Sequence, residues 1–490
     1  MSYTRKAVFG VGTILFIHLI AALLGYAFRF TLAQKLGVEQ YGLFFSVLAF
    51  FFLFSTIKDL GIGSALVITL PKLWLKNKWD QVKSYLAMAY LFKLVTAFLL
   101  AILFWALAPF LSEYLFKTTD AIFLLRVMAV VFFLGVNEEI LSSTFLGFQK
   151  YSYFACVELF KKILLLFFLF IFLRYGLAAP LFAYLLTAIL LPFALLPFLH
   201  KTFSFAHQTA TYSLPQLKTL LFLGLPFVFN TLTYSIISYF DTLLLTSLRT
   251  LREVGLYNAA LPTAMAVLYF MYAFDSVLQP LSAELYHSKK KEKLAQGLHI
   301  LHKYLFICIL PLVILLITHA ERILQVFYGA TFLPAAQALR ILMIGVLFYA
   351  IALMNLSVLS GIGQPKTVAK IMFWAALVNV ILNLIFIPFL GIAGAALTTT
   401  ISYALALILS CLKLKHYVTL QLPWKNWAKT LLGGLVLALL LYGSHMLPIW
   451  MDVFLILVSL ISYLLLLFLL RVLDWKEVCM LTKELTQKHK

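Results

Sequence analysis

Charged side chains occur inside long apolar stretches of this sequence, and their types make them the first candidates for chemistry. Lys58 and Asp59 lie near the centre of the stretch 43–70, and Lys93 lies a few turns into the stretch 84–111. A charge in the middle of a membrane-spanning helix costs at least about 2.5 kcal/mol, so it usually faces a cavity or an opposite charge. Each of these residues is therefore a site candidate, with a structural ion pair as the alternative interpretation.

A second group of charges follows along the chain. Glu138 and Glu139 are adjacent, and adjacent residues on a helix point about 100° apart, so these two carboxylates cannot face one partner directly. Glu158, Lys161 and Lys162 are spaced at i, i+3 and i+4, which places them on one helix face. Such residues can pair with one another or line a cavity, and the spacing leaves both interpretations open.

Two further charges stand apart from these groups. Arg29 lies within two turns of a predicted helix end, where a long side chain can also extend to water. Asp275 lies deep in the stretch 255–287 and has no charged neighbour in the sequence. The cysteines fit neither a disulfide framework nor a zinc site, and no glycine-rich phosphate loop is present. We therefore expect no metal, no cofactor and no catalytic residue.

The composition identifies the environment of these charges. Hydrophobic residues make up 64% of the 490 residues and charged residues only 11%, whereas soluble domains are about half apolar and a quarter charged. The net charge is +20, but the Lys and Arg residues lie in short clusters between apolar stretches. This placement is typical of membrane orientation signals and predicts no nucleic-acid partner.

The apolar stretches predict an all-α integral membrane protein with about fourteen transmembrane helices. A helix needs about 20 apolar residues to cross the hydrocarbon layer, and the stretches are continuous rather than alternating, which excludes a barrel. The predicted spans are 7–33, 43–70, 84–111, 121–147, 154–174, 178–200, 218–248, 255–287, 299–319, 335–360, 367–390, 391–412, 428–447 and 451–472.

The basic residues also predict an orientation. One alternate set of connections carries about 24 Lys and Arg residues, and the other carries about six. Because cytoplasmic connections are the more basic ones, both termini are predicted to be cytoplasmic. The connections on the outer side are all short, so the function must reside among the helices.

A weak internal repeat relates the first half of the chain to the second. Gly42 and Gly255 open corresponding spans, and Gly147 and Gly361 end corresponding spans. The repeat predicts two pseudo-symmetric six-helix lobes, which is an arrangement used by transporters with alternating access. The predicted parts are an N-terminal lobe at 1–200, a cytoplasmic linker at 201–217, a C-terminal lobe at 218–412, appended helices at 413–472 and a cytoplasmic tail at 473–490.

Two segments resemble a known family. Residues 36–67, LGVEQYGLFFSVLAFFFLFSTIKDLGIGSALV, and the segments SVLSGIGQPK and NVILNLIFIPFLGIAGAALTTTIS within 357–402 are similar to polysaccharide exporters. These belong to the multidrug/oligosaccharidyl-lipid/polysaccharide (MOP) flippase superfamily, and the resemblance extends over essentially the whole chain. It implies an O-antigen or exopolysaccharide type of flippase that moves a lipid-linked oligosaccharide from the cytoplasmic to the outer leaflet of the cytoplasmic membrane.

A polyprenyl pyrophosphate is an anion, and Arg and Lys are its natural partners. The headgroup candidates are Arg29, Lys58, Lys93, Lys161 and Lys162. The cavity or ion-coupling candidates, for a proton or a sodium ion, are Asp59, Glu138, Glu139, Glu158 and Asp275. Two other functions remain open: export of drugs, toxins or another lipid precursor by the same fold, and a membrane glycosyltransferase or polymerase, against which the short outer connections argue.

Overall fold

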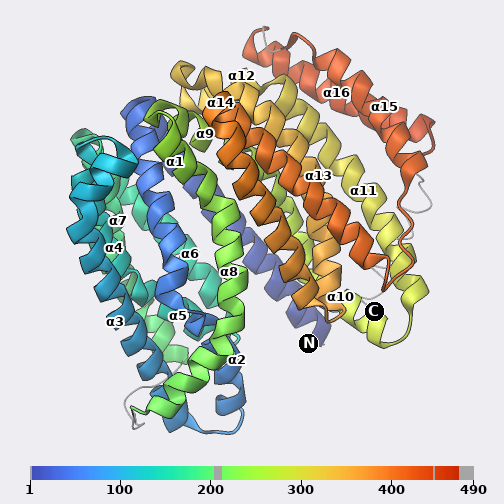
Figure 1. Ribbon diagram of the computed structural model, residues 1–490. Coiled ribbons are helices and arrows are strands. Elements are labelled where there is room, and N and C mark those ends of the chain that lie inside the picture. The colour runs from blue at the N-terminus through green and yellow to red at the C-terminus, as the bar shows by residue number, and fades with distance from the viewer. Residues whose placement is uncertain (1–2, 203–211, 445–446, 474–490) are drawn as a thin grey trace. The chain divides into compact units, whose positions relative to one another are not determined.

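The computed structural model describes residues 3–202, 212–444 and 447–473, and within these ranges it contains helices and no strand (Figure 1). The α-helices are α1 (Tyr3–Asp59), α2 (Ile62–Trp74), α3 (Trp79–Leu111), α4 (Asp120–Leu134), α5 (Val136–Gly147), α6 (Tyr151–Phe172), α7 (Ala178–Thr202), α8 (Leu214–Leu248), α9 (Leu251–Met265), α10 (Tyr269–His287), α11 (Lys291–Thr318), α12 (Ala320–Tyr328), α13 (Ala336–Gly361), α14 (Pro365–Leu414), α15 (Trp424–Leu441) and α16 (Ile449–Leu469). A π-helical turn (Ser112–Phe116) and three 3₁₀ turns (Leu173–Tyr175, Ala266–Leu268 and Ala330–Ala335) complete the set.

The helices fit a protein that crosses a membrane many times. Nine helical segments in the described ranges are long and apolar enough to span a membrane. Two of the nine contain a glycine with non-helical dihedral angles, Gly37 in α1 and Gly391 in α14. At each of these positions the structure joins two of the predicted spans into one long bent helix. The prediction of an all-α integral membrane protein is therefore confirmed.

Three predicted spans are interrupted at positions that sequence patterns did not indicate. The span 43–70 is divided between α1 and α2, because Leu60 and Gly61 have positive φ angles of 43° and 75°. Gly61 packs directly against the carbonyl group of Gly224 on α8, so there is no room for a side chain at this break. The spans 121–147 and 255–287 are also interrupted, by Gly135 and by the 3₁₀ turn at Ala266–Leu268.

Among the described residues five helices end with the same turn; one of these turns, at Arg471 after α16, lies outside the predicted repeat, and the other four lie in or close to its register. In these four turns the residues with positive φ are Asn77 (55°), Gln149 (57°), Lys289 (58°) and Gly363 (83°). The next N–H group bonds to the carbonyl five residues earlier, in the pairs Lys78–Leu73, Lys150–Phe145, Lys290–Leu285 and Gln364–Leu359. This is the Schellman ending of a helix.

These four turns fall into two corresponding pairs. Gln149 and Gly363 occupy the register that aligns Gly147 with Gly361, and Asn77 and Lys289 lie close to the same register. The first turn of each pair belongs to the N-terminal repeat and the second to the C-terminal repeat. The spacing of these four turns therefore matches the spacing of the sequence repeat to within two residues.

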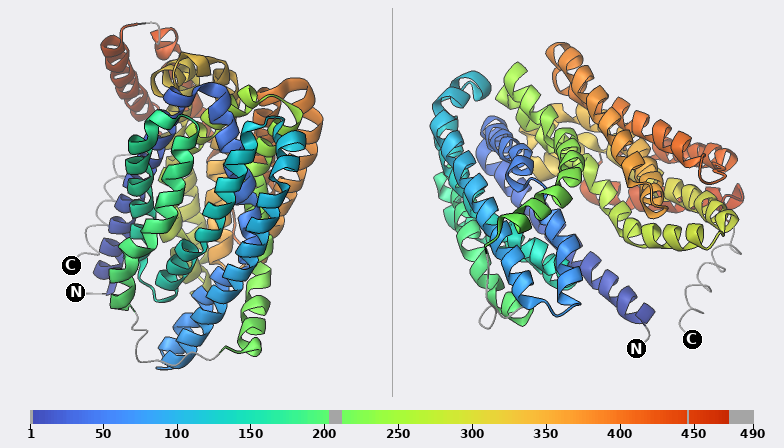
Figure 2. Two further views of the ribbon diagram at one scale, coloured as in Figure 1. Left: turned by 90° about the vertical axis from the view of Figure 1, so that its left-hand side faces the viewer. Right: turned by 60° about the horizontal axis from the view of Figure 1, so that its bottom comes forward.

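The residues form two compact units. Unit 1 consists of Met1–Asn258, Phe327–Phe332 and Ala376–Ala395. Within it α6 packs against α1 and α7, and α2 packs against α5 and α8. The blue to green helices of this unit run side by side in both views of Figure 2.

Unit 2 consists of Ala259–Val326, Leu333–Ala375 and Ala396–Lys490. Within it α11 packs against α13 and α15, α10 packs against α13, and α15 pairs with α16. Leu437, Tyr463 and Leu467 are buried where α15, α16 and α11 meet, which attaches the last two helices to this unit.

Candidate functional site

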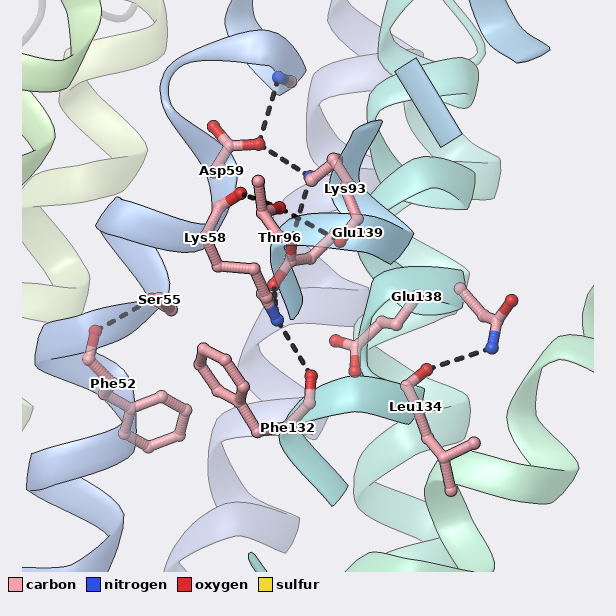
Figure 3. A network of polar contacts seen from close by, with 12 residues as sticks. Phe52, Ser55, Lys58, Asp59, Lys93, Thr96, Phe132, Leu134, Glu138 and Glu139 are labelled. Atoms are coloured by element: carbon pink, nitrogen blue, oxygen red, sulfur yellow. Dashed lines mark hydrogen bonds and ion pairs between the residues drawn. The ribbon is translucent and has the colours of Figure 1, made fainter. Parts of the chain in front are cut away.

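Four of the candidate residues form one ion-pair network inside unit 1, which we call the charge tetrad: Lys58, Asp59, Lys93 and Glu139 (Figure 3). Lys58 Nζ lies 2.7 Å from Glu139 Oε1. Lys93 Nζ lies 2.6 Å from Asp59 Oδ1 and 2.8 Å from Glu139 Oε2. The side chains of Lys58 and Lys93 are only 3% and 1% exposed, so both ammonium groups depend on these carboxylates for charge compensation.

The break between α1 and α2 determines where Lys58 and Asp59 of the charge tetrad lie. Asp59 is the last residue of α1, and its Oδ1 atom accepts a hydrogen bond of 3.1 Å from the N–H of Gly63 in the first turn of α2. Thr96 on α3 donates to the carbonyl of Lys58 at 3.0 Å. Both bonds satisfy backbone groups that the break would otherwise leave without a partner. Lys58 Nζ also donates to the carbonyl of Phe132 at 3.1 Å, near the end of α4.

The tetrad carries two positive and two negative charges and is therefore neutral as a unit. A buried ion pair is retained only when its partners remain close, because an uncompensated buried charge is costly. Lys58 and Lys93 are therefore already compensated, and an anionic ligand would have to compete with Glu139 and Asp59 for their ammonium groups.

Two further ion pairs lie on α5 and α6. Lys161 Nζ contacts Glu138 Oε1 at 2.8 Å, and Lys162 Nζ lies 3.5 Å from Glu158 Oε1. The i, i+4 spacing in the sequence suggested the pair between Glu158 and Lys162. Lys161 instead pairs with Glu138 on the neighbouring helix α5. Glu138 and Glu139 face different partners, as their adjacency required. All four side chains are between 22% and 42% exposed, so this group is more accessible than the two lysines of the tetrad.

Arg29 completes this group from α1. Its Nη1 atom donates to the carbonyl of Asn258 at 3.4 Å, and its guanidinium lies 4.2 Å from the centroid of the Phe45 ring. No carboxylate of the described residues lies within ion-pair distance of it. Arg29 and Lys161 both interact electrostatically with Tyr184, so the two cations share one region of unit 1.

We call Arg29, Lys161, Lys162, Glu138 and Glu158 the arginine cluster. It holds three positive and two negative charges, so it has a surplus of one positive charge. Arg29 supplies this surplus, because its described partners are neutral, among them a carbonyl and an aromatic ring. The cluster can therefore attract an anion without first breaking an ion pair.

A polar cluster surrounds Asp241, which was not among the candidate residues. This carboxylate is 1% exposed and accepts hydrogen bonds from the Tyr257 hydroxyl at 2.8 Å and from the Asn383 amide. Asn258, whose carbonyl accepts from Arg29, also donates to Thr242 at 3.3 Å. The asparagines inside apolar stretches were the available signal, since a buried amide needs partners as a buried charge does.

Unit 2 contains a second buried carboxylate that the sequence did not single out. Asp452 on α16 is 3% exposed, and its two oxygens contact His319 Nε2 at 3.0 Å and Arg322 Nη1 at 2.6 Å. Arg322 also donates to the carbonyl of Leu447 at 2.8 Å. These bonds fasten the start of α16 to the junction of α11 and α12.

The remaining candidate, Asp275, lies on α10, but its side chain falls outside the described residues. Within the side chains that are described, no group of three or more His, Cys, Asp or Glu residues is arranged to hold a metal ion.

Comparison with known proteins identifies the family to which the chain is similar. The family model described as polysaccharide biosynthesis protein matches residues 7–286, which is more than half of the chain, and the MatE model matches residues 226–385. An uncharacterized membrane protein of Methanocaldococcus jannaschii is 29% identical over 451 residues, which covers 89% of each chain. A probable low-salt glycan biosynthesis flippase of Haloferax volcanii is 22% identical over 224 residues, covering 44% of this chain and 48% of that protein.

Solved structures share the fold. The lipid II flippase MurJ in an inward closed conformation superposes with a TM-score of 0.79 at 17% identity, over 92% of this chain and 97% of that one. An inward-facing multidrug resistance MATE transporter of the MOP superfamily gives a TM-score of 0.70 at 17% identity, over 81% and 94%. The family model covers more than half of the sequence, and the chain belongs to the polysaccharide biosynthesis protein family, with a fold shared by MurJ and by MATE transporters.

Proposed function

We propose that this protein flips a polyprenyl-pyrophosphate oligosaccharide from the cytoplasmic to the outer leaflet of the cytoplasmic membrane for the synthesis of a cell-surface polysaccharide. Transport proceeds by alternating access between a lobe at 1–200 and a lobe at 218–412. The chain crosses the membrane fourteen times, with the bent helices divided at their glycines, and both termini lie in the cytoplasm. The repeated Schellman turns support the two-lobe division, and the basic connections support the orientation.

The observation that carries this proposal is the positive surplus of the arginine cluster. A pyrophosphate has several anionic oxygens, and Arg is suited to bind two of them at once through its planar guanidinium. Arg29 has its charge available, and Lys161 and Lys162 lie close by with carboxylates that ligand binding can displace. Such a site favours an anionic lipid over a cationic drug.

The charge tetrad has a different role in this proposal. Lys58 and Lys93 remain headgroup candidates, but they act after Arg29, when a bound anion competes with Glu139 and Asp59 for their ammonium groups. Displaced carboxylates are free to take up a proton or a sodium ion, which is the coupling role proposed for Asp59, Glu138, Glu139 and Glu158. Loading of the anion and uptake of the cation would then be one linked event.

The second candidate function is export of a drug or of another lipid precursor. The fold shared with MATE transporters and with MurJ leaves this function open, because that fold alone does not select a substrate. It predicts a different ligand preference, since a cationic drug gains nothing from the positive surplus around Arg29.

A binding measurement tests the proposed substrate class. Purified protein in detergent is titrated with a short-chain polyprenyl-pyrophosphate disaccharide and with a neutral glycolipid of the same sugar and chain. A charge-assisted hydrogen bond contributes about 1.5–3 kcal/mol, so we expect the pyrophosphate to bind at least about tenfold more tightly. Arg29→Gln removes this difference, whereas Lys366→Gln and Lys415→Gln, at exposed positions, leave it unchanged. Equal affinity of the wild type for both lipids contradicts the proposal.

A further inference from the structure

Unit 2 contains a cavity whose lining differs in chemistry from the two charged clusters of unit 1. Its volume is about 220 Å³, and it lies between α10, α13 and α14. Three methionines line it, Met271 from α10, Met354 from α13 and Met372 from α14, together with Leu353 and the ring of Tyr349. No charged side chain is among its described lining residues, and the polar ones include Gln279, Ser357 and Ser360, so the space suits a ligand that is mainly apolar and has a polar end.

Among the buried polar atoms of the described lining residues, the Ser357 hydroxyl has no hydrogen-bond partner. Ser357 on α13 is 6% exposed, and its hydroxyl oxygen makes no hydrogen bond with the described residues. A buried hydroxyl without a partner is unfavourable, and most serines in such helices satisfy it locally. Ser357 belongs to the cavity wall, so a ligand that brings one hydrogen-bonding atom would satisfy the hydroxyl there.

The lining of this cavity differs from the corresponding positions of the N-terminal repeat. In the register that aligns Gly147 with Gly361, Leu353 corresponds to Glu139 and Met372 corresponds to Glu158. The N-terminal repeat therefore has carboxylates of the charge tetrad and the arginine cluster at positions where the C-terminal repeat has apolar side chains. At these two corresponding positions the N-terminal repeat has charged side chains, and the C-terminal repeat has hydrocarbon or thioether side chains.

We propose that this cavity binds a stretch of the isoprenoid chain of a lipid phosphate close to its polar end, with the Ser357 hydroxyl donating to an oxygen of the phosphate ester. Methionine side chains are flexible and adapt to an irregular, methyl-branched chain. The volume exceeds the roughly 150 Å³ of an apolar cavity that binds benzene, so a short stretch of chain fits. The cavity lies in the half of α13 nearest Gly361, which is the cytoplasmic half in the proposed orientation.

This inference rests on the proposed function for the identity of the lipid, but its test does not require transport. The full chain, labelled with ¹³C at its methionine methyl groups, is placed in phosphatidylcholine nanodiscs and titrated with farnesyl monophosphate. Single Met→Leu substitutions assign the signals of the eleven methionines. We expect the signals of Met271, Met354 and Met372 to shift. The signal of Met343, fully buried elsewhere on α13, should stay in place.

Two variants and two control ligands make the test specific. Ser357→Ala should weaken the titration about two- to tenfold, the effect of one hydrogen bond. Leu353→Trp fills the cavity and should abolish the shifts, while Ile381→Trp, exposed on the same α14 helix as Met372, should preserve them. Inorganic pyrophosphate, which has no chain, should leave the three signals unchanged.

The proposal is overturned if the three signals do not move at saturating farnesyl monophosphate, or if the lipophilic cation tetraphenylphosphonium moves them equally. Failure here while the pyrophosphate lipid still binds through Arg29 would remove the cavity assignment alone. Loss of the Arg29-dependent preference with the methionine shifts intact would remove the proposed headgroup site instead.

Discussion

The ammonium nitrogen of Lys93 on α3 and the Oε2 atom of Glu139 on α5 lie 2.8 Å apart, and the lysine side chain is 1% exposed. The same nitrogen contacts Asp59 at the end of α1. The buried ammonium group of Lys93 thus connects α1, α3 and α5 at the point where α1 ends and α2 begins. Well-packed apolar residues in place of a buried ion pair are often equally or more stable, but the loss of one charged member leaves the others uncompensated.

Removal of the Lys93 charge is expected to be destabilising. Lys93→Met keeps most of the side-chain length and leaves Asp59 and Glu139 with Lys58 as their only tetrad cation. The free energy of unfolding should fall by about 3–5 kcal/mol, measured by thermal unfolding in detergent. Lys366→Met, at an exposed position on α14, is the control. An unchanged transition in the Lys93 variant would show that the ion pairs do not hold these helices.

Asp59→Asn separates transport from folding. The asparagine oxygen can still accept the hydrogen bond from the Gly63 N–H, and Lys93 keeps Glu139 as a partner at 2.8 Å, so the break between α1 and α2 should persist and membrane levels should fall less than in Lys93→Met. Export of the glycan should be lost, because a charge that lines a transport path matters to transport more than to folding. Full export by this variant would show that the charge is not required, and loss of the protein would support a packing role.

The orientation is tested by labelling. Ser288→Cys, between α10 and α11, and Thr250→Cys, between α8 and α9, are placed in a chain without its four native cysteines. Both positions are exposed. An impermeant maleimide applied to intact cells should label the cysteine at position 250 and reach position 288 only after permeabilisation. Labelling of position 288 from outside would reverse the proposed orientation.

The Asp452 contacts predict how the last two helices are attached. Asp452→Leu leaves Arg322 and His319 without their carboxylate, and breaking a buried pair costs about 3–5 kcal/mol. We expect a lower unfolding temperature and faster trypsin cleavage at Lys415, in the connection before α15. Met451→Leu, an exposed neighbour on α16, is the matched control. Equal cleavage of the two variants would argue that apolar packing alone holds α16.

Features that depend on local pattern could be predicted from the sequence. Continuous apolar stretches indicated the helices, and the i, i+4 spacing indicated the pair between Glu158 and Lys162. The pair between Lys161 and Glu138 could not be predicted, because these residues lie on different helices and their contact depends on packing. The break at Gly61 was missed for the same reason, since its cause is the backbone of Gly224, far away in the sequence.

The alternatives for Lys58 and Asp59 show a further limit. A local ion pair was the alternative interpretation for these two neighbours, yet Lys58 contacts Glu139 and Asp59 contacts Lys93. Adjacent side chains on a helix diverge, so each had to find a partner on another helix. The sequence identifies the buried charges, but only their packing shows that, among the three cations of the arginine cluster, Arg29 is the one whose described partners are all neutral.

The most direct test of the proposed function is transbilayer movement of the proposed substrate. Protein is reconstituted into liposomes with a fluorescent polyprenyl-pyrophosphate disaccharide, and the fraction of the lipid that an external quencher reaches is followed with time. We predict rapid exchange by the wild type and at least about a tenfold slower exchange by Arg29→Gln, with Lys415→Gln equal to wild type. A wild-type rate no faster than that of protein-free liposomes, or an unchanged rate in Arg29→Gln, would contradict this function.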